Sequence, residues 1–174
     1  MEKFWFLDEA GAHTKMARLY GRALRGQRVV CDIPGGHWKT WTMLSAMNLN
    51  GTVPTMVFEG GTDVAAMETF VAWLLIPELR SGDIVVMDNL AAHKSLKVKN
   101  LIESVGAEAW FLPTYSPDWN PIEHIWSKVK STLKRIAPRS DKQLLSAIGN
   151  SIDAITKHDI LNSIIHCGYV HNHS

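Results

Sequence analysis

Short runs of apolar residues, broken by turn-forming residues, recur along the first two thirds of this chain. Such runs are typical of strands in a buried or half-buried sheet. They predict strands at residues 3–8, 28–33, 38–47, 52–58, 83–88 and 107–112. The tripeptide Pro34-Gly35-Gly36 predicts a turn that joins the second and third of these strands. Pro54 places the fourth strand at a sheet edge or makes it an extension of that hairpin.

A helical period of about 3.6 residues appears between and after these runs. It predicts helices over residues 63–79, 95–105 and 121–136, the first of them capped by Thr62. Two further helices are predicted where the capping-box pattern appears, at Ser140 with Gln143 and at Thr156 with Asp159. This order of elements predicts one α/β domain over residues 1–174, with extra helices at its C-terminal end.

Three acidic residues stand at the ends of these predicted elements. Asp8 ends the run FWFLD, Asp88 ends the run DIVVMD, and Glu123 lies in the first turn of the helix over 121–136. A buried carboxylate without a partner is very costly. Two Mg²⁺ ions about 4 Å apart would supply that partner together with phosphoryl-transfer chemistry. The three acids are therefore candidate metal ligands.

Each acid also has a structural interpretation. Asp8 could begin a turn, and Asp88 could belong to ordinary turn chemistry at a strand end. Side-chain alternation does not settle whether Asp8 or Glu9 faces a site, and we favour Asp8 because Glu9 falls in the predicted turn. Glu123 occupies the third position of a capping box that begins at Asn120.

The helix over 121–136 carries two stripes when its residues are placed about 100° apart. The apolar stripe must face the core and consists of Ile122, Ile125, Trp126, Val129, Leu133 and Ile136. A second stripe beside it consists of Glu123, Ser127, Lys130 and Lys134. A helix cap needs only the acid, whereas a metal at Glu123 with a phosphate backbone beyond it would also account for the lysines.

The net charge of +1 gives no global electrostatic case for nucleic-acid binding, but the basic residues are clustered. One cluster follows the third acid and contains Lys128, Lys130, Lys134, Arg135, Arg139 and Lys142. Another follows the second acid and contains Lys94, Lys97 and Lys99. Each cluster could be a solvated helix face. Their positions favour contacts with DNA, for which the candidates are Lys94, Lys130, Lys134 and Arg135.

Loops beside the acids hold further candidates. Asn89 and His93 follow the second acid and could hold the metal ligands or a phosphate in place. Tyr115 or Trp119 could stack on a flipped base. A zinc-binding module is an unrelated alternative, built on the tail histidines His166, His171 and His173.

The composition favours a packed cytoplasmic domain. The apolar fraction is 46%, and no apolar stretch approaches the roughly 20 residues that span a bilayer. The two cysteines, Cys31 and Cys167, offer no disulfide framework, which suits a reducing cytosol. We therefore expect no membrane segment.

Three segments together resemble the DDE transposases of bacterial insertion sequences in the mariner-like superfamily. They are FLDE, VMDNLAAHK and YSPDWNPIEHIW, and 34 residues separate Asp88 from Glu123, which is similar to the spacing in that family. The segment GHWKTWTML at 36–44 also resembles the stretch that the family carries between its first two acids. The resemblance extends from Phe4 to about Tyr169.

This resemblance implies a ribonuclease H-like fold, with a mixed central sheet flanked by helices. Central strands would present Asp8 and Asp88, and a helix would bring Glu123. The three acids would bind Mg²⁺ or Mn²⁺, as two ions, for DNA cleavage and strand transfer. The implied partners are transposon ends, a TA-containing target and a second copy of the chain, at the nucleoid of a bacterial cell.

Members of that family carry helix-turn-helix modules before the catalytic domain, and this sequence begins close to its first predicted strand. We therefore expect the N-terminal DNA-binding region to be absent from residues 1–174. Two explanations stay open: the chain is the second reading frame of a split element, joined to an upstream product, or it is a truncated remnant. Two alternatives keep the same fold. One is a ribonuclease H-like nuclease without strand transfer, and the other is a catalytically idle truncated transposase that binds a full-length one.

Overall fold

The computed structural model describes residues 3–33, 35–90, 93–114 and 116–169, built around a five-stranded sheet. The strands are β1 (Phe4–Ala12), β2 (Trp41–Asn48), β3 (Thr55–Glu59), β4 (Ile84–Met87) and β5 (Glu108–Phe111). Their order across the sheet is β3-β2-β1-β4-β5. β2 is antiparallel to both β1 and β3, whereas β4 and β5 run parallel to β1. The sheet is therefore mixed, with β1 at its centre.

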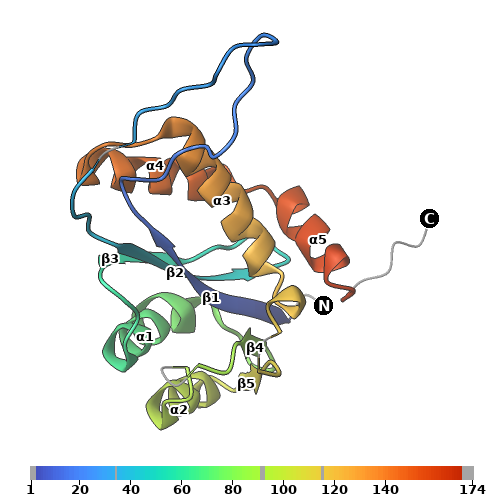
Figure 1. Cartoon of the computed structure of the whole chain (residues 1–174). Coiled ribbons are helices and arrows are strands. Elements are labelled where there is room, and N and C mark those ends of the chain that lie inside the picture. Colours follow the sequence, from blue (N-terminus) through green and yellow to red (C-terminus); the bar gives the residue numbers. More distant parts are fainter. Residues whose placement is uncertain (1–2, 34, 91–92, 115, 170–174) are drawn as a thin grey trace.

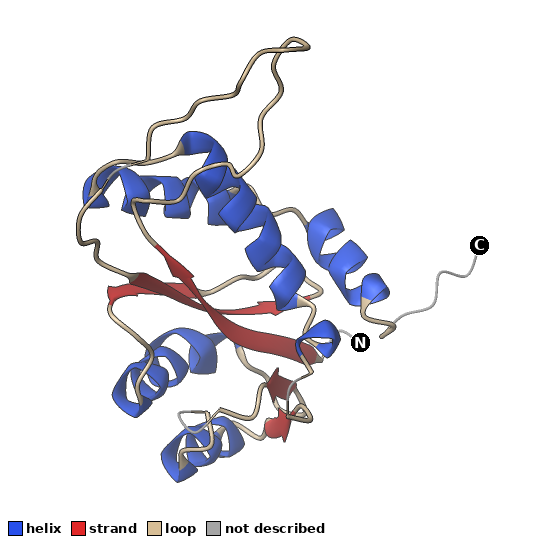
Figure 2. Cartoon of the chain, viewed as in Figure 1, coloured by secondary structure: helices blue, strands red, loops and turns tan. Residues whose placement is uncertain are grey.

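Helices cover both faces of this sheet (Figure 1, Figure 2). One face carries α1 (Val64–Phe70) and α2 (Leu96–Ser104). The other carries α3 (Ile122–Ile136), α4 (Asp141–Asp153) and α5 (Lys157–His166). Within the described ranges, no helix has the length and apolar character that crossing a membrane would need.

The side chains of β1 alternate between two apolar cores. Trp5 and Leu7 pack in the core beneath α1 and α2, and Phe6 packs in the core beneath α3, α4 and α5. Because side chains of a strand alternate with a period of two, Asp8 faces the α3 side and Glu9 faces the opposite side. The two neighbouring acids are therefore presented on different faces of the sheet.

β1 is longer than predicted. It continues to Ala12, and Glu9 pairs in register with Leu44 of β2. The expectation that Glu9 lies in a turn is wrong, because the pairing with β2 carries the strand past both acids. Alternation along the longer strand, rather than a turn, separates Asp8 from Glu9.

The predicted strand at 28–33, and its hairpin with 38–47, are not formed. Residues 18–33 are exposed and belong to a long loop between β1 and β2 that extends away from the body of the molecule (Figure 1). We call residues 18–40 the β1–β2 arm. The chain reverses near its tip, where the amide of Gln27 donates to the carbonyl oxygen of Leu24 at 2.9 Å. Pro34, in the predicted turn, lies outside the described residues.

The predicted helix over 63–79 is regular only in its first part. Asp63 rather than Thr62 caps it, and the Asp63 carboxylate accepts a backbone amide of the first turn at 2.7 Å. After α1 the chain passes through a π-helical turn and a 3-10 turn over 71–78. Pro77 lies in this stretch and has no amide hydrogen to continue the α-helical ladder.

Candidate active site

Asp8 is a buried carboxylate at the centre of the sheet. The residue is 7% exposed and its side chain faces α3. The indole N–H of Trp126, on the buried stripe of α3, donates to Oδ2 of Asp8 at 3.1 Å. Within the described ranges, no other side chain donates to this carboxylate. The helical pattern identifies Trp126 as a core residue but gives no sign of this bond, which joins residues far apart in the sequence.

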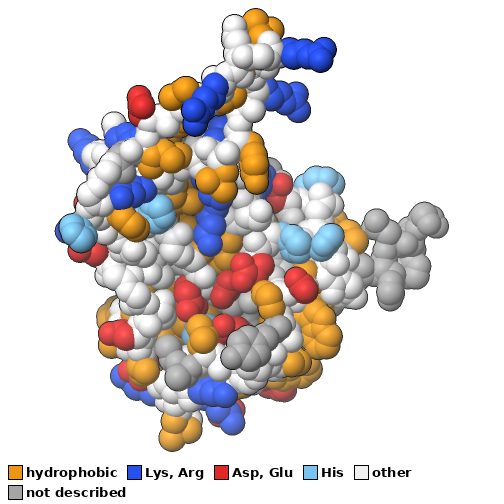
Figure 3. Space-filling view, in the orientation of Figure 1, with side chains coloured by type: hydrophobic (Ala, Val, Ile, Leu, Met, Phe, Trp, Pro, Cys, Tyr) orange, Lys and Arg blue, Asp and Glu red, His pale blue; other side chains and the backbone are white. Residues whose placement is uncertain are grey.

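Asp88 and Glu123 meet Asp8 at one cavity. Asp88 directly follows β4, the parallel neighbour of β1, and Glu123 lies in the first turn of α3. Together the three acids line a cavity of about 370 Å³. Figure 3 shows acidic side chains gathered near the middle of this face of the molecule. The structure thus brings together the three acids that the sequence pattern singles out.

The electrostatics of this cavity disfavour ionised carboxylates. Burial, together with the negative charges of Glu123 and Glu9, raises the pKa of Asp8 to about 8. Burial also raises the pKa of Glu123, although the positive charge of Lys130 opposes the change. No positively charged group is among the causes that shift the pKa of Asp8, and a bound cation would favour its ionised form.

His93 lies between Asp88 and Glu9. Its side chain is fully buried, its Nε2 is 3.0 Å from Oε2 of Glu9, and its Nδ1 makes a close ion-pair contact with Oδ1 of Asp88. Burial opposes a charged imidazole, but the two carboxylates outweigh it and raise the pKa of His93 to about 9.

The effect on Asp88 has the opposite sign. Burial alone would raise the pKa of Asp88, but the contact with His93 and its positive charge lower that pKa below the ordinary value. Asn89, the other predicted partner of the acids, is directed elsewhere: its Nδ2 donates to Oγ1 of Thr114 at 3.2 Å. His93 therefore contacts a predicted ligand directly, and Asn89 does not.

The capping box predicted at Asn120 and Glu123 is not formed. Pro121 is the N-cap of α3, and no side chain caps the helix. Asn120 is buried, and its Nδ2 donates instead to the carbonyl oxygen of Leu7 at 3.2 Å, which ties the start of α3 to β1 beside Asp8. Within the described residues, the Glu123 carboxylate accepts no hydrogen bond, so capping does not account for this acid.

The residues present fit a hard divalent cation by their chemistry. Asp8, Asp88 and Glu123 offer carboxylate oxygens, the donors that Mg²⁺ and Mn²⁺ prefer, and the raised pKa of Asp8 shows that its negative charge is poorly compensated. Among the described residues, no three His, Cys, Asp or Glu side chains stand close enough to hold an ion as they lie.

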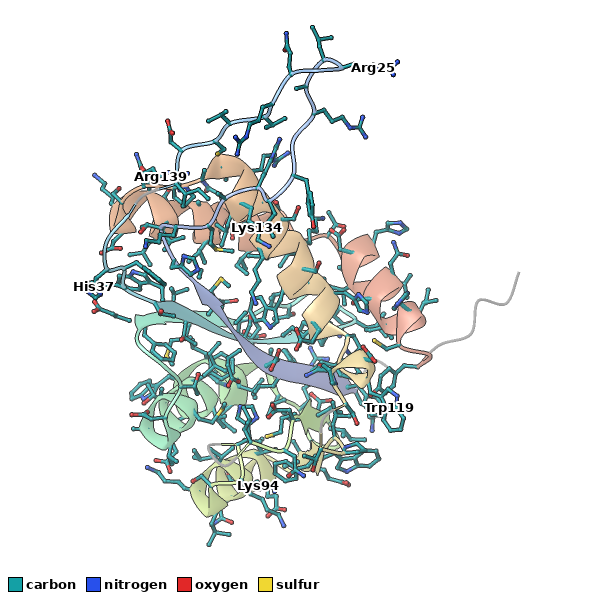
Figure 4. All side chains as sticks on the ribbon, in the orientation of Figure 1. Arg25, His37, Lys94, Trp119, Lys134 and Arg139 are labelled. Atoms are coloured by element: carbon teal, nitrogen blue, oxygen red, sulfur yellow. The ribbon has the colours of Figure 1, made fainter. Side chains whose placement is uncertain are left out.

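The predicted DNA contacts lie on both sides of the acids. Figure 4 places Lys134 on α3, Trp119 at the start of that helix, and Lys94 beside α2 across the sheet. Lys130 is close enough to Glu123 to influence its pKa. The exposed residues among the candidates are Lys94, Trp119 and Arg135, whereas Lys130 and Lys134 are partly buried. Tyr115, the remaining candidate, lies outside the described residues.

Other members of the basic clusters make structural contacts. Lys97 pairs with Glu68 at 2.8 Å and Lys128 with Asp159 at 2.5 Å. Arg139 donates to the carbonyl oxygen of Thr14 at 2.9 Å, at the base of the β1–β2 arm. Ion pairs and a backbone contact thus account for these residues better than a DNA contact does.

The zinc alternative receives little support from the residues that can be placed. The imidazole of His166, at the end of α5, packs edge-on against that of His124, with ring centroids 4.4 Å apart. The cluster of ligands that zinc needs is not seen in the described ranges, and His171 and His173 lie outside them. Cys31 and Cys167 are both free thiols.

The arrangement of the chain is shared with solved transposase structures. The Mos1 transposase paired-end complex with left transposon end has a TM-score of 0.76 and 16% identity, covering 97% of this chain and 53% of that chain. The Mos1 strand transfer complex has a TM-score of 0.74 and 15% identity, covering 97% of this chain and 52% of that chain. The mariner Mos1 paired end complex with Mg has a TM-score of 0.72 and 14% identity, covering 95% of this chain and 53% of that chain.

These comparisons confirm the ribonuclease H-like fold that the sequence resemblance implies. The chain spans about half the length of the Mos1 chains in those complexes. No curated protein sequence matches this one. A model of the DDE superfamily endonuclease family matches residues 3–145. Because that match covers most of the sequence, the chain belongs to the DDE superfamily of endonucleases.

Proposed function

We propose that this domain is the catalytic part of a transposase that cuts DNA at transposon ends and joins the freed end to target DNA. The observation that carries the proposal is the meeting of Asp8, Asp88 and Glu123 at one cavity, in a chain of the DDE endonuclease superfamily. The motif YSPDWNPIE and the spacing between the last two acids favour the bacterial insertion-sequence branch of the mariner-like superfamily.

The three acids would hold Mg²⁺ or Mn²⁺, as two ions, which when bound supply Lewis-acid activation of water or a 3′-hydroxyl and neutralise phosphate charge. Trp126 keeps the Asp8 carboxylate in one orientation through the bond to Oδ2. Asn120 holds the start of α3 against β1, and so sets the position of Glu123 relative to Asp8. The chain's own contribution is thus a rigid frame for three oxygen ligands.

The DNA would lie across this face, with its backbone against the basic side chains that flank the acids. Lys94 lies on one side, and Lys130, Lys134 and Arg135 lie on α3. Phosphate contacts of this kind position the nucleic acid without reading its sequence. We propose that Tyr115 or Trp119 stacks on a flipped base, and Asn89 would fix the adjoining loop through Thr114.

Recognition of particular transposon ends would then need residues beyond this domain. The matched Mos1 chains are about twice as long as this sequence, and we propose that an upstream DNA-binding module completes the enzyme. A TA-containing target, a homodimer on DNA and action at the bacterial nucleoid belong to the same proposal.

A strand-transfer assay tests this function. The purified domain is incubated with a pre-nicked transposon-end duplex and a target plasmid, with Mg²⁺, with Mn²⁺ or with EDTA. Asp88→Ala removes a proposed ligand, and Asp153→Ala, at the exposed end of α4, is the matched control. We expect joined product with either metal, from the wild type and from the control only.

Other outcomes separate the alternatives. Nicking without joining would favour a nuclease that lacks strand transfer. If the domain alone shows no reaction, the assay is repeated with a helix-turn-helix module fused to its N-terminus. Metal binding without turnover in that fusion, with inhibition of a full-length transposase, would favour the idle truncated partner and contradict the proposal.

A further inference from the structure

Glu9 is an acidic residue of this site to which the proposed function gives no role. It follows Asp8 on β1 but faces the other side of the sheet, where its side chain is 20% exposed. Its Oε2 lies 3.0 Å from Nε2 of His93, whose side chain is fully buried. A carboxylate on the central strand therefore fixes one end of a buried imidazole in the loop after β4.

The other end of that imidazole meets Asp88. Nδ1 of His93 contacts Oδ1 of Asp88, and the same Oδ1 accepts the backbone amide of Leu90 at 3.1 Å. One oxygen of Asp88 is thus engaged twice, whereas no group in the described ranges bonds to its Oδ2. Because Oδ1 is held by two contacts and Oδ2 by none, Oδ2 is available to bind a ligand in the cavity that Asp88 lines.

We propose that Glu9 is a positioning residue that, by holding His93, sets the orientation of the Asp88 carboxylate for metal binding. The inference rests on the proposed function, because it takes Asp88 as a metal ligand. The His93 ring is held at both ends, at Nε2 by Glu9 and at Nδ1 by Asp88, so removing the Glu9 carboxylate leaves the ring with one of its two attachments. Partners that orient a ligand in this way typically change metal affinity or activity by about 10–100-fold when removed.

Substitutions at Glu9 test the inference because they leave Asp88 and His93 in the chain. Glu9→Ala removes the acceptor, and Glu9→Gln keeps an oxygen acceptor at nearly the same place. Glu9→Asp shortens the side chain by one methylene and serves as a second variant where the alanine variant does not fold. Glu59→Gln, at the end of the edge strand β3 and half exposed, is the matched control.

Three quantities are measured on the purified domain: the dissociation constant for Mn²⁺, the kcat and KM for a transposon-end duplex, and the ¹⁵N resonances of the His93 ring. We expect Glu9→Ala to weaken Mn²⁺ binding and to lower kcat, each about 10–100-fold, with KM for DNA within about twofold. Glu9→Gln is expected to recover most of both losses. The His93 resonances move in Glu9→Ala, and all three quantities stay unchanged in Glu59→Gln.

Several results would overturn the inference. Mn²⁺ affinity and kcat within twofold of the wild type, with only a lower unfolding temperature, would make Glu9 a structural residue. A raised KM at unchanged kcat would assign it to DNA binding. Wild-type protein that neither binds Mn²⁺ nor cleaves DNA would reject the proposed function itself. Unmoved His93 resonances in Glu9→Ala would reject the link from Glu9 to the ring alone.

Discussion

Asp8 is held where an ionised carboxylate is least stable, and this gives the metal-free protein a particular pH dependence. Its pKa rises from 3.8 to about 8 on folding, so the stability that Asp8 contributes is complete below pH 3.8 and is lost as pH rises through 8. The pKa of His93 rises from 6.5 to about 9, so its contribution is complete below pH 6.5 and is lost as pH rises through 9.

The metal-free protein should therefore melt at a lower temperature at pH 9 than at pH 6, because both groups lose their stabilising protons in that interval. Mg²⁺ should raise the unfolding temperature more at pH 9, where Asp8 is ionised and able to bind it. Scanning calorimetry in EDTA and in Mg²⁺ measures both effects. Each kcal/mol of change in the free energy of unfolding shifts the unfolding temperature by roughly 2–4 °C. A Mg²⁺ effect that is equal at the two pH values would contradict this account.

Removing the buried charge of Asp8 should raise the stability of the metal-free protein and abolish its activity. Asp8→Asn keeps the shape of the side chain and an acceptor for the indole N–H of Trp126, but it removes the charge. We expect metal-free Asp8→Asn to melt at least about 2–4 °C above the wild type at pH 9, for a gain on the order of 1 kcal/mol. DNA cleavage should be lost. Asp153→Asn should change neither property. If Asp8→Asn melts below the wild type at pH 9, the ionised Asp8 carboxylate does not destabilise the metal-free protein.

At the residue scale, sequence patterns predict which residue types meet but not how they touch. Asp8 and Asp88 are predicted because buried runs that end in acids are unusual, and Glu123 because its helix carries two lysines on the same stripe. One cavity does join the three acids. The contacts that orient them are between residues distant in sequence, such as Trp126 with Asp8 and His93 with Glu9. No local pattern encodes those contacts, so the link through Glu9 emerges only from the structure.

α3 connects the stability of an element with the geometry of the site. Its buried face includes Trp126, which is 1% exposed and bonds to Asp8. Trp126→Phe should lower the free energy of unfolding by about 1–3 kcal/mol, because it leaves a small cavity and removes a hydrogen bond to a buried carboxylate. Urea unfolding at pH 8 measures this loss.

The matched control is Trp73→Phe. Trp73 is 77% exposed in the π-helical turn after α1, and its replacement should change the free energy of unfolding by less than about 0.5 kcal/mol. Equal losses in the two variants would mean that the bond to Asp8 contributes nothing measurable. A greater loss for Trp126→Phe in Mg²⁺ than in EDTA would indicate that the indole also supports metal binding.

The starts of the helices are predicted from nearby residues in two cases and not in a third. Ser140 and Thr156 cap α4 and α5 as predicted, and Thr156 forms a complete capping box with Asp159. Asn120 has the right residue type for a cap, but its amide bonds to the carbonyl oxygen of Leu7 instead. A cap is predictable when its partners are local, and a tertiary contact overrides it when the helix start is buried against the sheet.

At the scale of the whole molecule, the largest difference from the sequence pattern is the β1–β2 arm. Residues 28–33 have the composition of a strand, yet Val29 and Val30 are 47% and 78% exposed. A strand needs neighbours for its backbone hydrogen bonds and for its apolar face, and this segment lies away from the sheet (Figure 1). Most strands of the sheet and the helices that cover it follow from periodicity, whereas the placement of the arm depends on contacts that periodicity does not describe.

The arm should therefore be dispensable for stability. Replacing residues 20–35 with a short Gly-Ser linker keeps its base, where Arg139 bonds to the carbonyl oxygen of Thr14 and Trp38 packs against His13 and Lys15. We expect the free energy of unfolding to stay within about 0.5 kcal/mol of the wild type, because surface residues away from special contacts contribute little. Urea unfolding of the shortened chain measures this.

Trp38→Ala is the informative comparison, because it disturbs the base rather than the tip. The ammonium of Lys15 lies 3.8 Å from the centroid of the Trp38 ring, and losing this contact should cost about 0.5–1 kcal/mol. A shortened arm that costs more than the Trp38 variant would mean that the tip packs on the body. If instead the shortened chain is as stable as the wild type, the fold that carries Asp8, Asp88 and Glu123 is intact. Any loss of DNA joining in that chain then comes from the loss of the arm's own contacts.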